Sequence, residues 1–109
     1  MDSDEPLKDS ENSTRDVFLL TKSPKSDRSK ICMRLMALSE NSILYLAGDG
    51  VYNLLDDAVK ALPRERILAC REDLLARGVQ PGMIAVIPND FYERLIGDIM
   101  FDGSKIYAF

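Results

Sequence analysis

Histidine is absent from this sequence of 109 residues, and cysteine occurs only twice, as Cys32 and Cys70. Without histidine the chain has no Ser–His or Cys–His catalytic pair and lacks a principal ligand of zinc, although carboxylates alone could still hold a hard cation. Small secreted domains usually carry more cysteines, so we expect both thiols to be reduced. We therefore expect no cofactor and no metal, and any nucleophilic chemistry to be that of a thiol.

Long apolar runs are also missing. No stretch approaches the roughly 20 apolar residues that span a bilayer, and the polar N-terminus is unlike a signal peptide, so we expect a cytoplasmic protein. The net charge of −4 argues against a general nucleic-acid surface. Residues 1–16 are rich in Asp, Glu and Ser and nearly free of apolar side chains, which predicts a disordered acidic tail before one domain over residues 17–109.

The clearest local pattern covers residues 43–62. A continuous apolar run over 43–47 is typical of a strand that is buried on both faces of a parallel sheet. The glycines on either side of Asp49 then favour a sharp turn, and apolar residues at helical spacing predict a helix over 51–62, before Pro63. Asp49 and Tyr52 should therefore lie at the carboxyl end of the strand, where open α/β sheets keep their sites.

Strands and helices are expected to alternate along the rest of the chain. Further strands are predicted over 17–21, 66–70, 83–87 and 104–109, and helices over 27–38, 71–77 and from residue 91. Ser26 or Asp27 should cap the first helix, whose core stripe would be Ile31, Leu35 and Leu38, with Cys32 on its flank. The inward side chains of the last two helices would be Leu74 and Leu75, and Phe91, Leu95, Ile96 and Ile99. This alternation predicts a three-layer, flavodoxin-like α/β sandwich with a five-stranded, mainly parallel sheet in the order 2-1-3-4-5.

The residues required for two common functions of such a fold are missing from this sequence. A loop that cradles phosphate through its backbone needs glycine after the first strand, and residues 21–26 contain none. A phospho-acceptor receiver domain needs acids at the end of that strand, and these are missing as well.

Several short segments together resemble one family. Residues 21–24 (Thr-Lys-Ser-Pro), Cys32, residues 49–52 (Asp-Gly-Val-Tyr) and residues 76–78 (Ala-Arg-Gly) are similar to the sulfur-relay family called DsrH or TusB. Supporting matches follow the same order over residues 34–35, 44–46 and 91–95. The resemblance covers residues 17–109.

The resemblance implies a DsrE-like fold and a subunit of an oligomeric complex. Its expected partners are homologous DsrE/TusD-like and DsrF/TusC-like subunits and a small sulfur-carrier protein, with no direct contact to nucleic acid or membrane. Such a complex accepts persulfide sulfur and passes it toward 2-thiouridine synthesis in tRNA or toward sulfur oxidation. The alternative is a non-catalytic assembly subunit whose cysteines are incidental. Without its partners, the chain is expected to form a homo-oligomer.

Both cysteines are candidate sulfur carriers. Cys32 stands where the DsrH branch has its cysteine, among five cations within residues 22–34 that only Asp27 opposes. Cys70 and residues 77–79 (Arg-Gly-Val) resemble the active-site run of the DsrE/TusD branch, although residues 71–73 (Arg-Glu-Asp) replace its alanine-rich segment and the chain ends without that branch's tryptophan. Because Cys70 should end a strand just before a helix, beside Arg71, we expect it to be the more reactive thiol. Either cysteine could instead be a small core residue.

Overall fold

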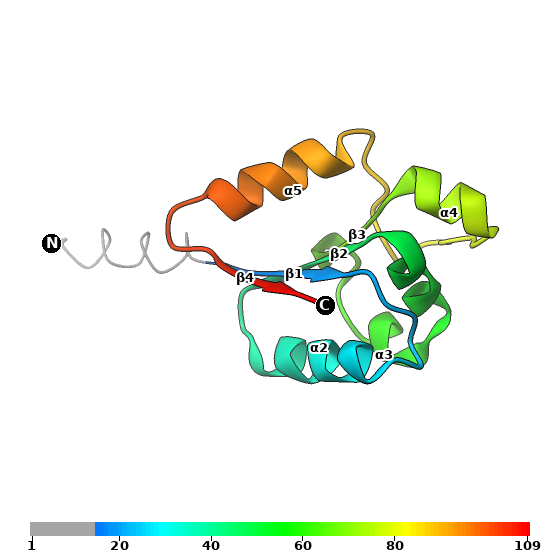
Figure 1. Ribbon diagram of the computed structural model, residues 1–109, viewed down its shortest axis with the longest axis horizontal. Helices are drawn as coiled ribbons and strands as arrows, with labels where there is room; N and C mark the ends of the chain where they lie inside the picture. The colour runs from blue at the N-terminus through cyan, green and yellow to red at the C-terminus, as the bar shows by residue number, and fades with distance from the viewer. Residues whose placement is uncertain (1–14) are drawn as a thin grey trace, which may run out of the picture.

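The structure, a computed structural model, describes residues 15–109. Four strands form one sheet in which every pair is parallel: β1 (Asp16–Leu20), β2 (Ser42–Leu46), β3 (Ile67–Ala69) and β4 (Lys105–Ala108). Their spatial order is β3-β2-β1-β4 (Figure 1). The expectation of an α/β fold with a parallel sheet is confirmed.

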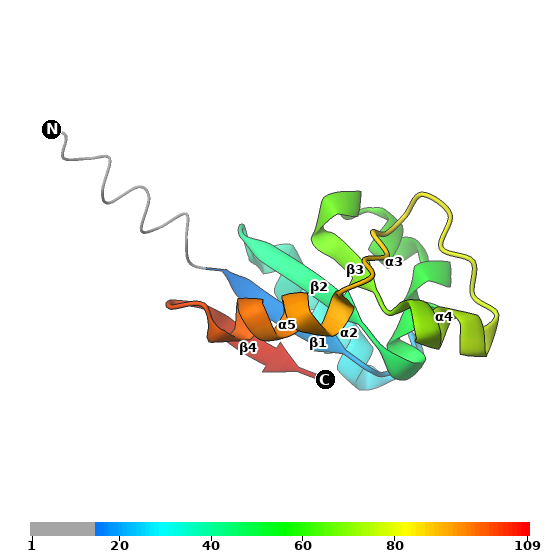
Figure 2. The ribbon, with the colours of Figure 1, turned by 90° about the horizontal axis from the view of Figure 1, so that it is seen from above.

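Helical segments lie between these strands. In chain order they are α2 (Asp27–Leu38), the 3₁₀ helix η1 (Gly48–Leu55), α3 (Asp57–Lys60), the 3₁₀ turn η2 (Arg64–Arg66), α4 (Arg71–Arg77) and α5 (Phe91–Met100). The ribbon shows α2 and α3 on one face of the sheet and α5 on the other (Figures 1 and 2). The molecule therefore has three layers, helices on both faces of one sheet.

Each face of the sheet has its own apolar core. Phe18, Leu20, Leu44 and Leu46 point toward α2, while Val17, Tyr45 and Leu68 point toward α5. This alternation follows from the two-residue period of a strand, and it explains why the strand sequences are apolar almost without interruption. Tyr45 is buried and its phenol donates a hydrogen bond to Asp98 of α5, which anchors that helix to the sheet.

The predicted fourth strand over residues 83–87 is wrong. Only Val86 reaches the sheet, through an isolated parallel bridge to Leu68 and two backbone hydrogen bonds of 2.8 and 3.0 Å with the β3 residues Ile67 and Ala69. Pro88 has no backbone N–H to donate, and the Ile84 N–H donates to the carbonyl oxygen of Pro81 at 3.2 Å, so the ladder does not extend on either side of Val86. The sheet has four strands instead of five.

The predicted strand order 2-1-3-4-5 is also wrong, because it placed the third strand beside the first. In the structure β2 lies between β1 and β3, and the other neighbour of β1 is the last strand. Beyond β4, Phe109 accepts a backbone hydrogen bond from Thr21 and donates one to Leu19, which keeps the end of the chain on β1. Apolar runs predict which segments are strands, but tertiary packing decides which strands become neighbours.

The predicted helix over 51–62 is instead η1 followed by the short α3, with Asp56 between them. A Cβ on Gly50 would lie 1.9 Å from the carbonyl oxygen of Leu20, so η1 packs directly on the end of β1. Buried Asn53 donates hydrogen bonds to the carbonyl oxygens of Lys22 and Gly50. These contacts hold η1 against the end of β1 and the loop after it, and Leu55 at the end of η1 is exposed.

The predicted core stripe of α2 is wrong at two of its three residues, since only Leu35 packs against the core. Ile31 and Leu38 are 49% and 81% exposed, whereas Ser29, Cys32 and Met36 are buried. The Ser29 hydroxyl donates to the carbonyl oxygens of Lys22 and Ser23 at 2.9 and 2.6 Å, which fixes the rotation of the helix. The predicted cap is confirmed, since the Ser26 hydroxyl accepts a hydrogen bond from the Arg28 N–H.

Other apolar side chains that were predicted to face inward are exposed too. Leu75 of α4 and Ile96 and Ile99 of α5 lie on the surface, while Leu74, Phe91 and Leu95 are buried as expected. The domain thus presents apolar side chains on the outer faces of α2, α4 and α5.

The N-terminal boundary differs slightly from the expected one. β1 begins at Asp16, inside the range 1–16 that was assigned to a disordered tail, and Arg15 forms an ion pair of 3.2 Å with Asp98. The rest of that expected tail lies outside the described residues. Over residues 15–109, none of the helices combines the length and the apolarity needed to cross a bilayer.

Candidate functional site

Three segments that are far apart in the sequence, the loop after β1, η1 and α4, meet at the carboxyl end of the sheet. The Gly48 N–H at the start of η1 donates to Asp73 Oδ2 of α4 at 2.7 Å, and Arg77 Nε donates to Asp49 Oδ1 at 3.0 Å. On the other side, Asn53 Nδ2 donates to the Lys22 carbonyl oxygen at 2.8 Å. The η1 segment therefore links α4 to the loop after β1, as the rule for open α/β sheets predicts for a site.

Glycine is required at both ends of this turn. Gly48 has a φ of +56°, a left-handed conformation that a side chain disfavours, and Gly50 leaves no space for a Cβ against Leu20. The Gly-Asp-Gly sequence is thus needed for the backbone to turn here. Asp49, between the glycines, is exposed and pairs with Arg77.

Cys70 lies where the sequence predicted, after β3 and at the N-cap of α4. Its N–H donates to the Leu46 carbonyl oxygen at 3.0 Å, and its Sγ lies 3.4 Å from Glu72 Oε1 and 4.0 Å from Tyr92 Oη. The residue is buried against the α5 side of the sheet. The thiol therefore donates a hydrogen bond to a carboxylate.

Burial is the main cause that raises the pKa of the Cys70 thiol above its usual value, and the side-chain hydrogen bonds to Asp73 and Glu72 raise this pKa further. A backbone hydrogen bond in the first turn of α4 acts in the opposite direction. The charged residues that act on this pKa are thus the acids Asp73 and Glu72. Arg71, which was expected to stabilise the thiolate, is not among them. In this conformation Cys70 is a protonated thiol at neutral pH.

A small surface pocket lies next to Cys70. Its volume is about 110 Å³, and its lining includes Glu72 and Tyr92, the two side chains in contact with the Cys70 sulfur. Both side chains belong to exposed residues. A shift of these two side chains would therefore open a path from solvent to the sulfur.

Cys32 is a core residue. It is fully buried among Phe18, Met36 and Leu44, and this burial raises the pKa of its thiol to about 12. The cations near it in sequence, such as Lys30 and Arg34, are exposed and project from α2 into solvent. The local excess of positive charge therefore does not activate this thiol.

The structure does not bring the two cysteines together. Cys32 belongs to the core on the α2 face of the sheet, and Cys70 belongs to the core on the α5 face. The sheet separates them. Any chemistry at one cysteine must proceed without the other in this conformation.

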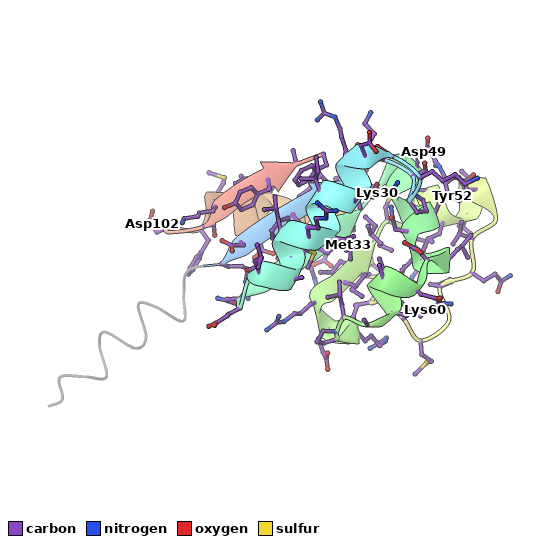
Figure 3. All side chains as sticks on the ribbon, turned by 90° about the horizontal axis from the view of Figure 1, so that it is seen from below. Lys30, Met33, Asp49, Tyr52, Lys60 and Asp102 are labelled. Atoms are coloured by element: carbon purple, nitrogen blue, oxygen red, sulfur yellow. The ribbon has the colours of Figure 1, made fainter. Side chains whose placement is uncertain are left out.

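Tyr52 is half-buried and packs on the α2-side core. It lines a second, wider pocket together with Lys25 and Lys30. Figure 3 shows Lys30 and Tyr52 on one face of the molecule.

Glu72, Asp73 and Tyr92 were not singled out from the sequence. Asp73 and Arg77 are four residues apart on α4 and form an ion pair of 3.5 Å, a spacing that the sequence displays. The contact of Tyr92 with Cys70 joins residues that are 22 apart in the chain, and no local sequence pattern predicts it.

Among residues 15–109, no three Cys, Asp or Glu side chains gather as ligands for a metal ion. No known family model, curated protein or solved structure matches this chain significantly.

Proposed function

We propose that this chain is a subunit of a sulfur-relay assembly of the DsrH/TusB kind. One observation carries the proposal: three segments that resemble that family, residues 21–24, 49–52 and 76–78, lie together at the carboxyl end of a parallel sheet. Arg77 donates to Asp49 and so joins two of them directly, and Asn53, the residue after the 49–52 segment, donates to the carbonyl oxygen of Lys22. These segments are far apart in the sequence, and the fold brings them together at one site. This proximity supports a shared function for them. The likeness extends over the whole domain and suggests homologous subunits and a small carrier protein as partners.

Within such an assembly we assign the sulfur-accepting role to Cys70. Its thiol, which donates to Glu72 Oε1 at 3.4 Å in the described conformation, loses its proton to water once that contact is broken. The thiolate attacks the terminal sulfur of a carrier persulfide, the S–S bond of the carrier breaks, and the carrier leaves as a thiolate. Cys70 then holds the sulfur as a persulfide. A carrier or partner subunit that displaces the Glu72 and Tyr92 side chains would expose the sulfur for this step.

A second function is favoured by a different observation. Both thiols are buried and protonated, and the outer faces of α2 and α5 expose apolar side chains that include Leu38, Ile96 and Met100. Exposed apolar surface of this kind is typical of an interaction face. In this alternative the chain is an assembly subunit that positions its partners and carries no sulfur itself.

Sulfur loading separates the two functions. The protein, Cys70→Ser and Cys32→Ala are incubated with glutathione persulfide, and the added 32-Da increment expected for one sulfur atom is located by mass spectrometry of peptides. We expect the Cys70 peptide to carry it in the protein and in Cys32→Ala, and no sulfur on Cys70→Ser. Loading that persists on Cys70→Ser would assign the role to Cys32. No loading of any variant, with the folded state verified by circular dichroism, would leave the assembly role.

A further inference from the structure

A wide pocket on the α2 side of the molecule has no part in the chemistry assigned to Cys70. Its volume is about 650 Å³, within the range of small-molecule sites. The loop after β1, the start of α2 and the end of η1 surround it. The side chains that matter here are Ser23, Lys25, Lys30, Tyr52, Leu55 and Asp56.

Two free cations give this pocket its charge. Within residues 15–109, neither Lys25 nor Lys30 forms an ion pair or a side-chain hydrogen bond, unlike Lys60 of α3, which pairs with Asp57 at 3.6 Å. Asp56 is the only acid in the lining, so the pocket has a net positive charge in a chain whose net charge is −4. An anion is therefore attracted to this part of the surface.

The opposite wall is apolar and includes a ring. Tyr52 is half-buried with one side packed on the core, and Leu55 is 61% exposed beside it. A flat aromatic side chain next to an exposed leucine favours stacking of a planar group. Figure 3 shows Lys30 on α2 and Tyr52 on η1 on the same face of the molecule.

Hydrogen bonds fix the walls of the pocket before any ligand arrives. The Ser29 hydroxyl donates to the carbonyl oxygens of Lys22 and Ser23, and Asn53 donates to that of Lys22 as well. These bonds hold the loop after β1 against both α2 and η1. A preformed pocket loses little conformational entropy when it binds a ligand.

We infer that this pocket binds a small anion that carries a planar ring, of the class of a nucleoside monophosphate. The ring lies against Tyr52 and Leu55, and the phosphate lies between the ammonium groups of Lys25 and Lys30. Asp56 and Ser23 are placed to hydrogen-bond ligand hydroxyl groups. Because residues 21–26 contain no glycine, the phosphate is held by lysine side chains and not by a backbone cradle.

Titrations with three probes test this inference by nuclear magnetic resonance. AMP has the ring and the phosphate, adenosine has the ring alone, and inorganic phosphate has the charge alone. We expect AMP to shift the amide signals of residues 23–30 and 52–56 at millimolar concentration, and to bind several-fold more tightly than adenosine or phosphate. Added salt should weaken the binding of AMP, since the lysines are exposed.

A matched pair of variants locates the site. Lys30→Gln removes one pocket cation, whereas Lys60→Gln removes a similarly exposed cation that lies away from the pocket (Figure 3). We expect Lys30→Gln to weaken AMP binding about fivefold and Lys25→Gln/Lys30→Gln to weaken it more, with no change in Lys60→Gln. The inference is overturned if AMP gives no shifts at these residues, if phosphate binds as tightly as AMP, or if Lys60→Gln has the same effect as Lys30→Gln.

Discussion

Arg77 Nε lies 3.0 Å from Asp49 Oδ1, and this ion pair joins the last turn of α4 to the turn that follows β2. The same guanidinium lies 3.5 Å from Asp73, whose other oxygen accepts the Gly48 N–H. Asp49 is thus held by a residue of α4, and this contact connects η1 to α4 at the carboxyl end of the sheet.

Asp49→Asn should lower the thermal midpoint of unfolding only slightly. The carboxylate is 61% exposed, so solvent screens the pair, and Arg77 keeps its contact with Asp73. High salt should reduce the difference between this variant and the unchanged protein. Asp102→Asn is the control, because Asp102 is exposed and forms no ion pair within the described residues. A large loss in Asp49→Asn that salt does not reduce would contradict the exposed-pair explanation.

Gly50→Ala should destabilise the fold far more. The new Cβ would lie 1.9 Å from the Leu20 carbonyl oxygen, a backbone atom that cannot move without disturbing β1. We expect a loss of roughly 3 kcal/mol in the free energy of unfolding, at the upper end of overpacking effects. Gly97→Ala is the matched control, since nothing lies within 4 Å of its Cβ and alanine favours the interior of α5 by about 0.5–1 kcal/mol. Urea unfolding measures both, and equal stabilities would refute the packing argument.

The sequence predicted the parts of the fold that depend on local pattern. The four paired strands and the Ser26 cap follow from hydrophobic runs and from capping chemistry. The strand over 83–87 failed because apolar composition does not reveal whether a segment between two prolines can reach the sheet edge. Only Val86 makes that contact.

The predicted core stripe of α2 failed at Ile31 and Leu38 for a different reason, although the bounds of the helix are confirmed. Ile31 and Leu38 are more apolar than Ser29 and Cys32, so periodicity favoured the wrong face. Ser29 is buried because its hydroxyl donates hydrogen bonds to two carbonyl oxygens of the loop after β1. Hydropathy alone does not predict such a contact. For the site, the position of Cys70 at a strand end was predictable, whereas its contacts with Glu72 and Tyr92 depend on how α4 and α5 pack.

Cys32 should make the protein less stable in alkali. Burial raises the pKa of its thiol from the usual 9.0 to about 12. Below pH 9 the thiol is neutral in the folded and the unfolded protein, so it does not change the free energy of unfolding. Between pH 9 and 12 the unfolded protein loses the proton and the folded protein keeps it, so the free energy of unfolding falls as the pH rises. Cys32→Ala should show a shallower fall over this window in urea unfolding than the unchanged protein. Parallel curves would mean that the thiol is accessible to water in the fold.

Cys70 should react with iodoacetamide before Cys32 in the native protein, and Glu72→Gln should speed that reaction. The Glu72 carboxylate accepts a hydrogen bond from the Cys70 thiol and so favours its neutral form, which raises the pKa of the thiol after the larger effect of burial. A neutral amide removes the negative charge, lowers this pKa and increases the fraction of thiolate, the species that is alkylated.

Glu93→Gln is the control, because Glu93 lines the same small pocket without a hydrogen bond to Cys70. Alkylation rates at pH 7.5 to 9.5, followed by mass spectrometry, give both the order and the apparent pKa. If Glu93→Gln accelerates the reaction as much as Glu72→Gln, pocket charge alone governs the thiol, and if Cys32 reacts first, the assignment of the sulfur-accepting role to Cys70 fails.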